Sequence, residues 1–261
     1  MRTPIFQVDA FTTRRFAGNP AAVMPLDRFP DDDLLQALAA ENNLAATAFL
    51  VPERDDYRLR WFTPTIELPL CGHATLASAA VVMERLEPGR GRVVFHSASG
   101  PLTVTRTASG YRMGFPARPS RPVPAPPGLV EALGAAPVEV WADPLNLLAL
   151  LESAPVVREL APDPAAVARL DCRGVIVTAP GEGGYDLISR YFTPAQGVSE
   201  DSVTGSAHCA LTPFWARRLG KTELRAYQAS RRGGEIVCRL AGDRVELEGA
   251  CVFYLEGQAE I

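Results

Sequence analysis

Residues Arg60–Pro64 read Arg-Trp-Phe-Thr-Pro, and residues Arg190–Pro194 read Arg-Tyr-Phe-Thr-Pro, a near copy 130 positions later in a chain of 261 residues. The likeness continues, since Gly72–Thr75 opens one run of small residues and Gly205–His208 opens another. A repeat of this length is a duplicated domain, because solenoid units recur at about 20–50 residues. The sequence therefore predicts two similar domains in one chain.

Each half of the chain contains strand-like segments and one helix that is apolar on most sides. These helices are expected over 72–86 and 205–219, and a helix of this kind is buried rather than amphipathic. Between the halves, Pro116–Pro127 contains six prolines and is predicted to be a stiff, extended linker. We expect an α+β fold with two pseudo-symmetric domains, 1–118 and 119–261, each a bent antiparallel sheet or barrel around a central helix. The alternative is a single mixed domain with a coincidental repeat.

The bulk composition narrows the class of protein. A net charge of −4 offers no electrostatic case for nucleic acid. No apolar run approaches the roughly 18 residues that a membrane helix needs, and the N-terminus has no signal-peptide pattern. The five cysteines are scattered, without a Cys-x-x-Cys pair, so we expect reduced thiols in a cytoplasmic protein.

Several cofactor chemistries lack their sequence signatures. The only lysine, Lys221, follows Gly220 at the expected end of a helix, which argues against a pyridoxal phosphate Schiff base. The three histidines form no His-x-x-x-His pair or dense Cys/His cluster, so no metal is expected. Neither a dinucleotide-binding nor a phosphate-binding glycine motif is present. The chain is therefore predicted to work without a cofactor.

Both central helices begin with glycine, at Gly72 and Gly205. The first amides of a helix have no partner within it and carry the positive end of its dipole, so they suit an anion such as a carboxylate. Glycine also lets a ligand approach the backbone closely. Junctions between domains favour ligand sites, and we expect a small carboxylate there. The alternative is that both glycines only permit tight packing where a strand turns into a helix.

Three residues near these helix starts are candidates for proton transfer. A thiol at a helix N-terminus has a lowered pKa, so Cys71 is either an acid–base group or an inert buried cysteine. His73 lies in the first turn, where the dipole favours its neutral form, and it is either a donor or base or a packing residue. Asp201 either caps the loop before the second helix or carries a proton. His208, one turn into that helix, is expected to pack.

Four segments together resemble one family over nearly the whole chain. They are Gln7–Phe11 with Gly18–Pro20, Leu70–Thr75 (LCGHAT), Glu200–His208 (EDSVTGSAH) and Gln228–Gly234. They look like the motifs of the PhzF family of phenazine-biosynthesis isomerases.

The resemblance implies two domains of the diaminopimelate-epimerase fold, an active site between them, no cofactor and a homodimer. It also implies a cofactor-free isomerisation in which a proton moves within the substrate. His73 and Asp201 match the family's histidine and aspartate. Gly72, Gly205 and Ser206 match its substrate-binding backbone, and Asn19 is carried over as a substrate-binding residue.

One departure from the family pattern concerns its proton-carrying glutamate. That glutamate lies in an Asn-Leu-Ser-Glu-Thr segment, whereas Asn43–Phe49 here reads Asn-Leu-Ala-Ala-Thr-Ala-Phe. Ala46 therefore occupies the glutamate's place in the substrate-binding region, and Ala45 replaces the serine. General acid–base catalysis is worth roughly 10²–10⁴ in rate, so the phenazine-type mechanism should not run unchanged.

Three hypotheses follow. The first is a PhzF-like isomerase or epimerase that uses His73, Asp201 and Cys71 on a small carboxylate. The second is a homologue without catalytic power that binds a small acid or a protein partner. The third is a dehydratase-type lyase that uses Cys71 alone, as the Cys/Thr pair Cys71 and Thr204 resembles the arrangement of hydroxyproline dehydratases on this fold.

Overall fold

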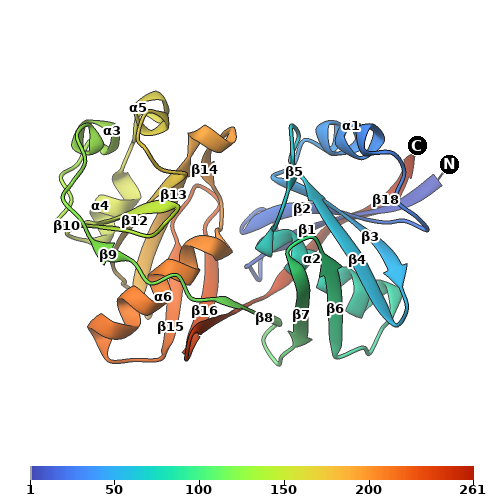
Figure 1. The fold of residues 1–261 in the computed structure, drawn as a ribbon. Coiled ribbons are helices and arrows are strands. Elements are labelled where there is room, and N and C mark those ends of the chain that lie inside the picture. The colour runs from blue at the N-terminus through green and yellow to red at the C-terminus, as the bar shows by residue number, and fades with distance from the viewer. Residues whose placement is uncertain (1) are drawn as a thin grey trace. The chain divides into compact units, whose positions relative to one another are not determined.

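The computed structural model describes residues 2–261, which divide into two compact units. The first contains the chain up to Gly114 together with Glu248–Ile261, and the second is Phe115–Leu247 (Figure 1). The division at 118/119 assigned the end of the chain to the second half. In the structure, β18 (Cys251–Glu260) instead pairs along the whole of β1 (Arg2–Ala10) in the first unit. No local sequence pattern predicts that strands at the two ends of a chain will pair.

Among residues 2–261, the first unit contains ten further elements. In chain order they are β2 (Asn19–Pro25), α1 (Asp32–Asn42), β3 (Ala46–Glu53), β4 (Asp56–Phe62), β5 (Glu67–Leu68), α2 (Gly72–Val81), the π-helical turn η1 (Val82–Leu86), β6 (Arg92–Ser97), β7 (Gly100–Arg106) and β8 (Tyr111–Pro116), which runs past the boundary. Strand β17 (Arg244–Gly249) crosses the other boundary and lies mostly in the second unit.

The second unit is built from the elements between these boundaries. They are β9 (Arg121–Pro122), α3 (Leu129–Leu133), β10 (Glu139–Ala142), β11 (Asn146–Leu150), α4 (Ala154–Glu159), α5 (Pro164–Ala168), β12 (Gly174–Pro180), β13 (Leu187–Thr193), the 3-10 turn η2 (Pro194–Gln196), β14 (Val198–Asp201), α6 (Gly205–Leu219), β15 (Glu223–Gln228) and β16 (Gly234–Ala241). The short elements α4, η2 and β14 were not predicted from the sequence.

The two units repeat the same strand pairings, which explains the duplicated sequence. In the first unit β1–β2 is antiparallel, β2–β3 parallel, β3–β4 antiparallel, β4–β6 parallel and β6–β7 antiparallel. In the second unit β10–β11, β11–β12, β12–β13, β13–β15 and β15–β16 follow the same order of directions. The α+β plan with a helix inside each half is confirmed.

The sheets are mixed, whereas the sequence led us to expect antiparallel pairing. A parallel pair needs a crossover connection, and helices supply each one here. Helix α1 connects β2 to β3, α2 lies between β4 and β6, and α6 lies between β13 and β15. The same crossovers carry the two central helices across their sheets.

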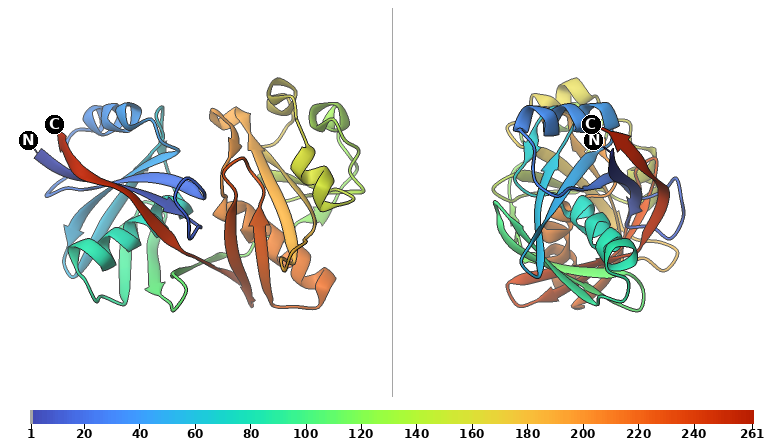
Figure 2. Two further views of the ribbon diagram at one scale, coloured as in Figure 1. Left: turned by 180° about the vertical axis from the view of Figure 1, so that it is seen from behind. Right: turned by 90° about the vertical axis from the view of Figure 1, so that its right-hand side faces the viewer.

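Helix α2 is enclosed by the strands of its own unit. Every residue from His73 to Val81 is buried, and the helix packs against β1, β2, β3 and β18 (Figure 2). The predicted helix over 72–86 is correct in position, but its last turn is π-helical, with the Glu87 amide donating to the Val82 carbonyl at 2.7 Å. The central helix is thus a rigid support for whatever its N-terminus holds.

Helix α6 spans Gly205–Leu219 as predicted and ends at Gly220, which has a φ of +65°. Pro213 lies inside the helix and has no amide hydrogen, so the carbonyl four residues earlier, at Cys209, loses its helical partner. The amide of Arg118 donates to that carbonyl at 2.9 Å. The proline-rich stretch therefore lies against the second unit, rather than forming the separate linker expected.

The arginine of the repeated pentamer has the same structural role in both units. Arg60 makes two hydrogen bonds to the Glu67 carboxylate, at 2.7 and 2.8 Å, and its guanidinium lies 5.1 Å from the Phe62 ring centre. Arg190 does the same with Glu200, at 2.7 and 3.0 Å, and lies 4.8 Å from the Phe192 ring. Bidentate pairs of this kind fix geometry as well as charge. In each unit the pair holds the short strand, β5 or β14, that precedes the central helix.

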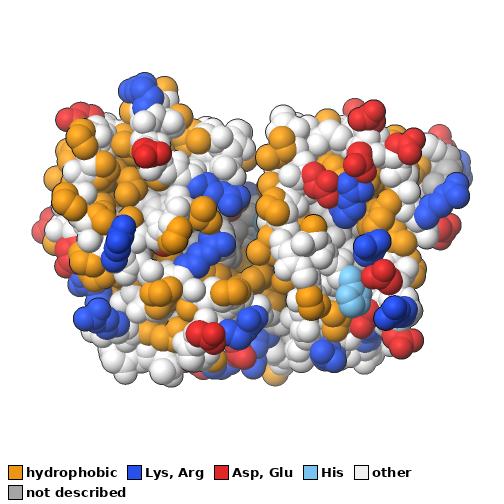
Figure 3. Space-filling view, viewed as in Figure 1, with side chains coloured by type: hydrophobic (Ala, Val, Ile, Leu, Met, Phe, Trp, Pro, Cys, Tyr) orange, Lys and Arg blue, Asp and Glu red, His pale blue; other side chains and the backbone are white. Residues whose placement is uncertain are grey.

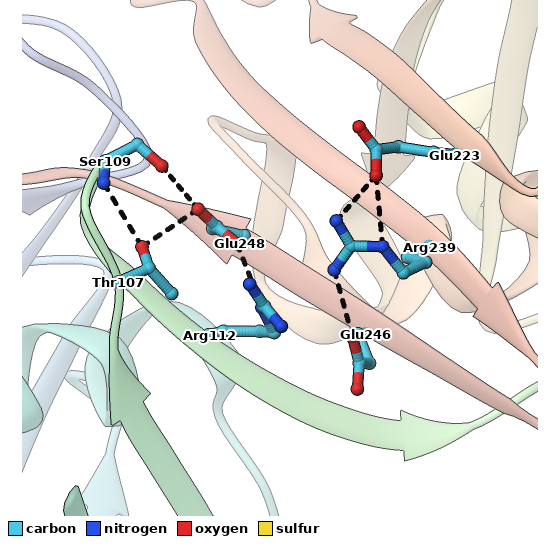
Figure 4. Close-up of polar contacts among 7 residues, drawn as sticks. All are labelled: Thr107, Ser109, Arg112, Glu223, Arg239, Glu246 and Glu248. Carbon is cyan, nitrogen blue, oxygen red and sulfur yellow. Dashed lines mark hydrogen bonds and ion pairs between the residues drawn. The ribbon is translucent and has the colours of Figure 1, made fainter.

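Further hydrogen bonds and ion pairs link neighbouring segments within each unit (Figure 4). In the first unit Glu248 accepts from Thr107, Ser109 and Arg112, which ties the turn after β7 to the returning chain. Burial raises the pKa of Glu248, but these three donors together outweigh it and leave the pKa below its ordinary value. In the second unit Arg239 joins Glu223 and Glu246.

The surface carries both signs of charge on each unit, with no single-sign block on the face in Figure 3. Within residues 2–261, no helix has the length and apolar character to cross a membrane.

Candidate functional site

The N-terminus of α2 gathers four residues that the sequence singled out. Cys71 is the N-cap residue and Gly72 the first helical one. The side-chain nitrogen Nδ2 of Asn19 lies 3.2 Å from Nδ1 of His73, and Sγ of Cys71 lies 3.5 Å from the same Nδ1. All three side chains are buried. Residues 54 positions apart thus form one polar cluster.

This geometry assigns a role to the imidazole nitrogens. The Nδ2 group of Asn19 can only donate, so in this contact Nδ1 of His73 is the acceptor. The Cys71 thiol lies close enough to exchange a proton with the ring. A thiol beside an imidazole is an arrangement in which a proton can pass between sulfur and nitrogen, which acid–base chemistry needs.

The position of Asn19 depends on the glycine before it. Gly18 has a φ of +67°, and a Cβ at this position would lie 2.2 Å from the Ala10 carbonyl oxygen. A side chain cannot be accommodated there without moving the backbone. Asn19 pairs with Ala10 in the β1–β2 ladder, so the glycine fixes where the amide group enters the cluster.

Ala46 begins β3, on the strand beside Asn19's own. It pairs with Ala21 in β2 and is fully buried. The two carboxylates nearest in sequence do not replace the missing glutamate. Glu41 is exposed near the end of α1, and Glu67 is held by Arg60. The structure therefore places a methyl group at this position, and neither Glu41 nor Glu67 supplies a carboxylate there.

The N-terminus of α6 gathers a second set of residues. Thr204 is the N-cap residue, and its hydroxyl donates to Oδ2 of Asp201 at 2.6 Å. Asp201 therefore contacts the side chain of the cap rather than acting as the cap itself. Gly205 is buried, whereas Ser206 is exposed in the first turn. The predicted residues Asp201, Gly205 and Ser206 thus lie together at this helix start.

Gln228 organises this second set and was missed as a site residue. Its Oε1 accepts from the Thr204 amide at 2.8 Å. Its Nε2 donates to the Asp201 carbonyl at 2.7 Å and to the Thr204 hydroxyl at 3.1 Å. The side chain is fully buried, so one amide group holds both the carboxylate residue and the helix cap. Only its place in the motif Gln228–Gly234 pointed to it.

His208 packs inside the second unit, as expected, and within residues 2–261 its ring makes one hydrogen bond. Its Nδ1 donates to the Thr204 carbonyl at 2.8 Å. Its Nε2 is buried and has no hydrogen-bond partner among residues 2–261. Burial lowers the pKa of His208 to about 4, so the ring is neutral at physiological pH.

The buried histidine predicts an acid-dependent loss of stability. The unfolded chain takes up a proton near pH 6.5, whereas folded His208 does so only near pH 4, so the unfolded state binds more protons between these values. Stability contributed by neutral His208 is present above pH 6.5 and falls as the pH drops toward 4, by about 3 kcal/mol.

The check is urea unfolding between pH 4 and pH 7. We expect His208→Gln to lose this component of the pH dependence. His96 lies half-buried on β6, and the control variant His96→Gln should retain it. Equal slopes for wild type and His208→Gln would contradict the assignment.

No group of three or more His, Cys, Asp or Glu side chains in the described part of the chain is arranged to hold a metal ion. The two candidate sites consist of acid, base and amide groups of the protein.

Comparison with known proteins places these features in a family. The sequence profile of the phenazine biosynthesis-like proteins, PhzC-PhzF, matches residues 8–257. An uncharacterised isomerase of Pseudomonas aeruginosa is 49% identical over 261 residues, covering 100% of each chain. A crystal structure of a PhzF-family phenazine biosynthesis protein from Enterococcus faecalis is 41% identical, covers 100% of both chains and superposes with a TM-score of 0.96.

A more distant structure shows that the fold extends beyond these relatives. A hydroxyproline epimerase from Agrobacterium vitis is 12% identical and matches with a TM-score of 0.62, over 98% of this chain and 92% of its own. This likeness concerns the fold alone and supports the epimerase-like architecture. From the profile match and the near-full-length relatives, the chain belongs to the PhzC-PhzF family of phenazine biosynthesis-like proteins.

Proposed function

We propose that this protein is an isomerase that moves a proton within a small carboxylate substrate, using acid–base groups from both helix starts. The observation that carries the proposal is the matched pair of clusters, Cys71 with His73 at α2 and Asp201 with Thr204 at α6. Relatives described as uncharacterised isomerases support the reaction class.

In the proposed reaction, Asp201 removes a proton from a carbon of the substrate and becomes the carboxylic acid. The electron pair shifts along the substrate, and the Cys71–His73 pair delivers a proton to a second carbon. Both groups then return to their starting states by exchange with solvent. No electrons leave the substrate, so the step needs no redox partner.

The amides of the two helix starts supply the binding of the carboxylate in this proposal. Gly72 is the first residue of α2, and Gly205 and Ser206 are the first residues of α6. Their N–H groups have no helical acceptor, and the dipole of each helix favours an anion. Asn19 and Ala46 are the remaining proposed substrate-binding positions. The proposal includes that both helix starts bind one and the same substrate.

Deuterium incorporation tests the reaction class directly. The protein is incubated in D₂O with a panel of cyclic carboxylates and amino acids, and exchange at ring and α-carbons is followed by NMR. We expect deuterium in at least one carboxylate, because two different groups remove and return the proton. Exchange that is absent throughout, with carboxylate binding intact, would contradict catalysis.

Two other functions each have an observation in their favour. A homologue without catalytic power that binds a small acid or a protein partner fits the buried Ala46. A dehydratase-type lyase fits the Cys71 thiol beside His73. The D₂O experiment separates these two functions. The binding homologue gives no deuterium exchange. The lyase gives exchange together with loss of water from the substrate, and Cys71→Ala abolishes both.

The remaining expectations are also proposals. The proposed chemistry requires no cofactor. The family resemblance suggests a homodimer, and the scattered cysteines suggest a cytoplasmic location. Light scattering of the purified protein measures whether it is a homodimer.

A further inference from the structure

The N-cap carbonyl of α2 accepts from two donors of one residue. The Thr75 hydroxyl donates to the Cys71 carbonyl at 2.7 Å, and the Thr75 amide donates to the same oxygen at 3.1 Å. The side-chain bond is the shorter of the two. Thr75 is fully buried, so this hydroxyl has no competing water.

The N-cap carbonyl of α6 is held in the same way by a different residue type. Nδ1 of His208 donates to the Thr204 carbonyl at 2.8 Å, and the His208 amide reaches the same oxygen at 3.3 Å. Again the side-chain bond is shorter. In both helices the donor lies four residues after the cap, at matching positions of the repeat, Cys71–Thr75 and Thr204–His208.

These carbonyls belong to the peptide units that carry the first helical amides. The Cys71 carbonyl shares its planar unit with the Gly72 N–H, and the Thr204 carbonyl shares its unit with the Gly205 N–H. In a trans peptide the carbonyl and the N–H point in opposite directions. A donor that pins the carbonyl along the helix therefore aims the glycine N–H away from the helix body, and it also polarises that N–H.

Ordinary hydroxyl bonding within helices does not account for both contacts. Ser78 donates to the Ala74 carbonyl at 2.7 Å, so a serine or threonine bond to the fourth preceding carbonyl is common in these helices. A buried histidine in that role is costly, because its Nε2 is left without a partner, and such groups call for an explanation. Among residues 2–261, the Thr204 carbonyl is the one hydrogen-bond partner of the His208 ring.

We propose that Thr75 and His208 are equivalent positioning residues, which fix the Cys71–Gly72 and Thr204–Gly205 peptides so that the two glycine amides are aimed at the substrate carboxylate. This inference rests on the proposed function for its ligand, although its geometry does not depend on turnover. His208 is neutral at physiological pH, because burial lowers its pKa, and it therefore holds the carbonyl with the Nδ1 proton alone.

The first test uses the amide resonance of Gly72 in the ligand-free protein. We expect Thr75→Val, which keeps the shape but loses the hydroxyl, to shift the Gly72 amide proton upfield, and Thr75→Ser to restore it. Ser78→Ala, which removes the corresponding bond one turn further along the same helix, leaves the resonance in place. With benzoate as the carboxylate probe, Thr75→Val should weaken binding about three- to tenfold, the worth of one hydrogen bond.

The second test needs no variant. The nitrogen-15 spectrum of His208 in the unmodified protein should show a protonated Nδ1 and a bare Nε2 from pH 5 to pH 8. A Gly72 resonance that is unchanged in Thr75→Val, or that moves equally in Ser78→Ala, overturns the role of Thr75. A proton on Nε2 overturns the role of His208. Failure of the proposed isomerase would appear separately, as an absence of deuterium exchange in the unmodified protein.

Discussion

Asp201→Asn is expected to reduce deuterium exchange into the substrate by about 10²–10⁴, the usual worth of general acid–base catalysis. The amide keeps an oxygen that accepts from the Thr204 hydroxyl, so the hydrogen bond at 2.6 Å and the start of α6 should survive. What is lost is the carboxylate's ability to take up a proton. The rate of exchange at saturating carboxylate, followed by NMR, measures the effect.

The matched control is Asp143→Asn. Asp143 accepts from the amides of Leu145 and Asn146 in a turn of the same unit and has no place in the proposed chemistry. We expect it to leave the exchange rate unchanged. Thermal unfolding of both variants excludes loss of fold as the cause. If Asp201→Asn keeps more than a tenth of the exchange rate, Asp201 is not the base.

Ala46→Glu is expected to raise the exchange rate by roughly 10²–10⁴ on a substrate of the dihydroxyanthranilate type, because it restores the proton carrier of the family pattern. Ala46 lies at the start of β3, next to the strand that carries Asn19, so a carboxylate there would enter the region of the His73 cluster. The added bulk at a buried position should lower stability by about 1–3 kcal/mol.

Ala45→Glu serves as the control for the position of the added charge. Ala45 lies in the bend before β3 and is only half-buried, whereas Ala46 belongs to the strand and is fully buried. We expect no gain in exchange from this variant. If Ala46→Glu binds the carboxylate and shows no gain, the pocket has diverged from the family along with its glutamate.

The features that the sequence predicted well are those marked by local residues. Gly72 and Gly205 mark helix starts, Gly220 marks the end of α6, and the apolar run after His73 predicts a buried helix. Each signal acts within one or two turns of chain, where backbone preference decides the structure.

The features that it did not predict depend on contacts between distant segments. Gln228 reaches Thr204 from β15, 24 residues away, and no local pattern marks a glutamine as a helix anchor. The parallel pairs depend on how the helical crossovers pack. The pairing of β18 with β1 joins the two ends of the chain, and tertiary contacts alone set it.

We propose that the amides of both helix starts bind one carboxylate. This proposal is tested most directly by a single titration of glycine-labelled protein with benzoate, in which the amide resonances of Gly72 and Gly205 are followed together. We expect both resonances to move, with one common dissociation constant. Movement of only one, or two unrelated constants, would contradict it.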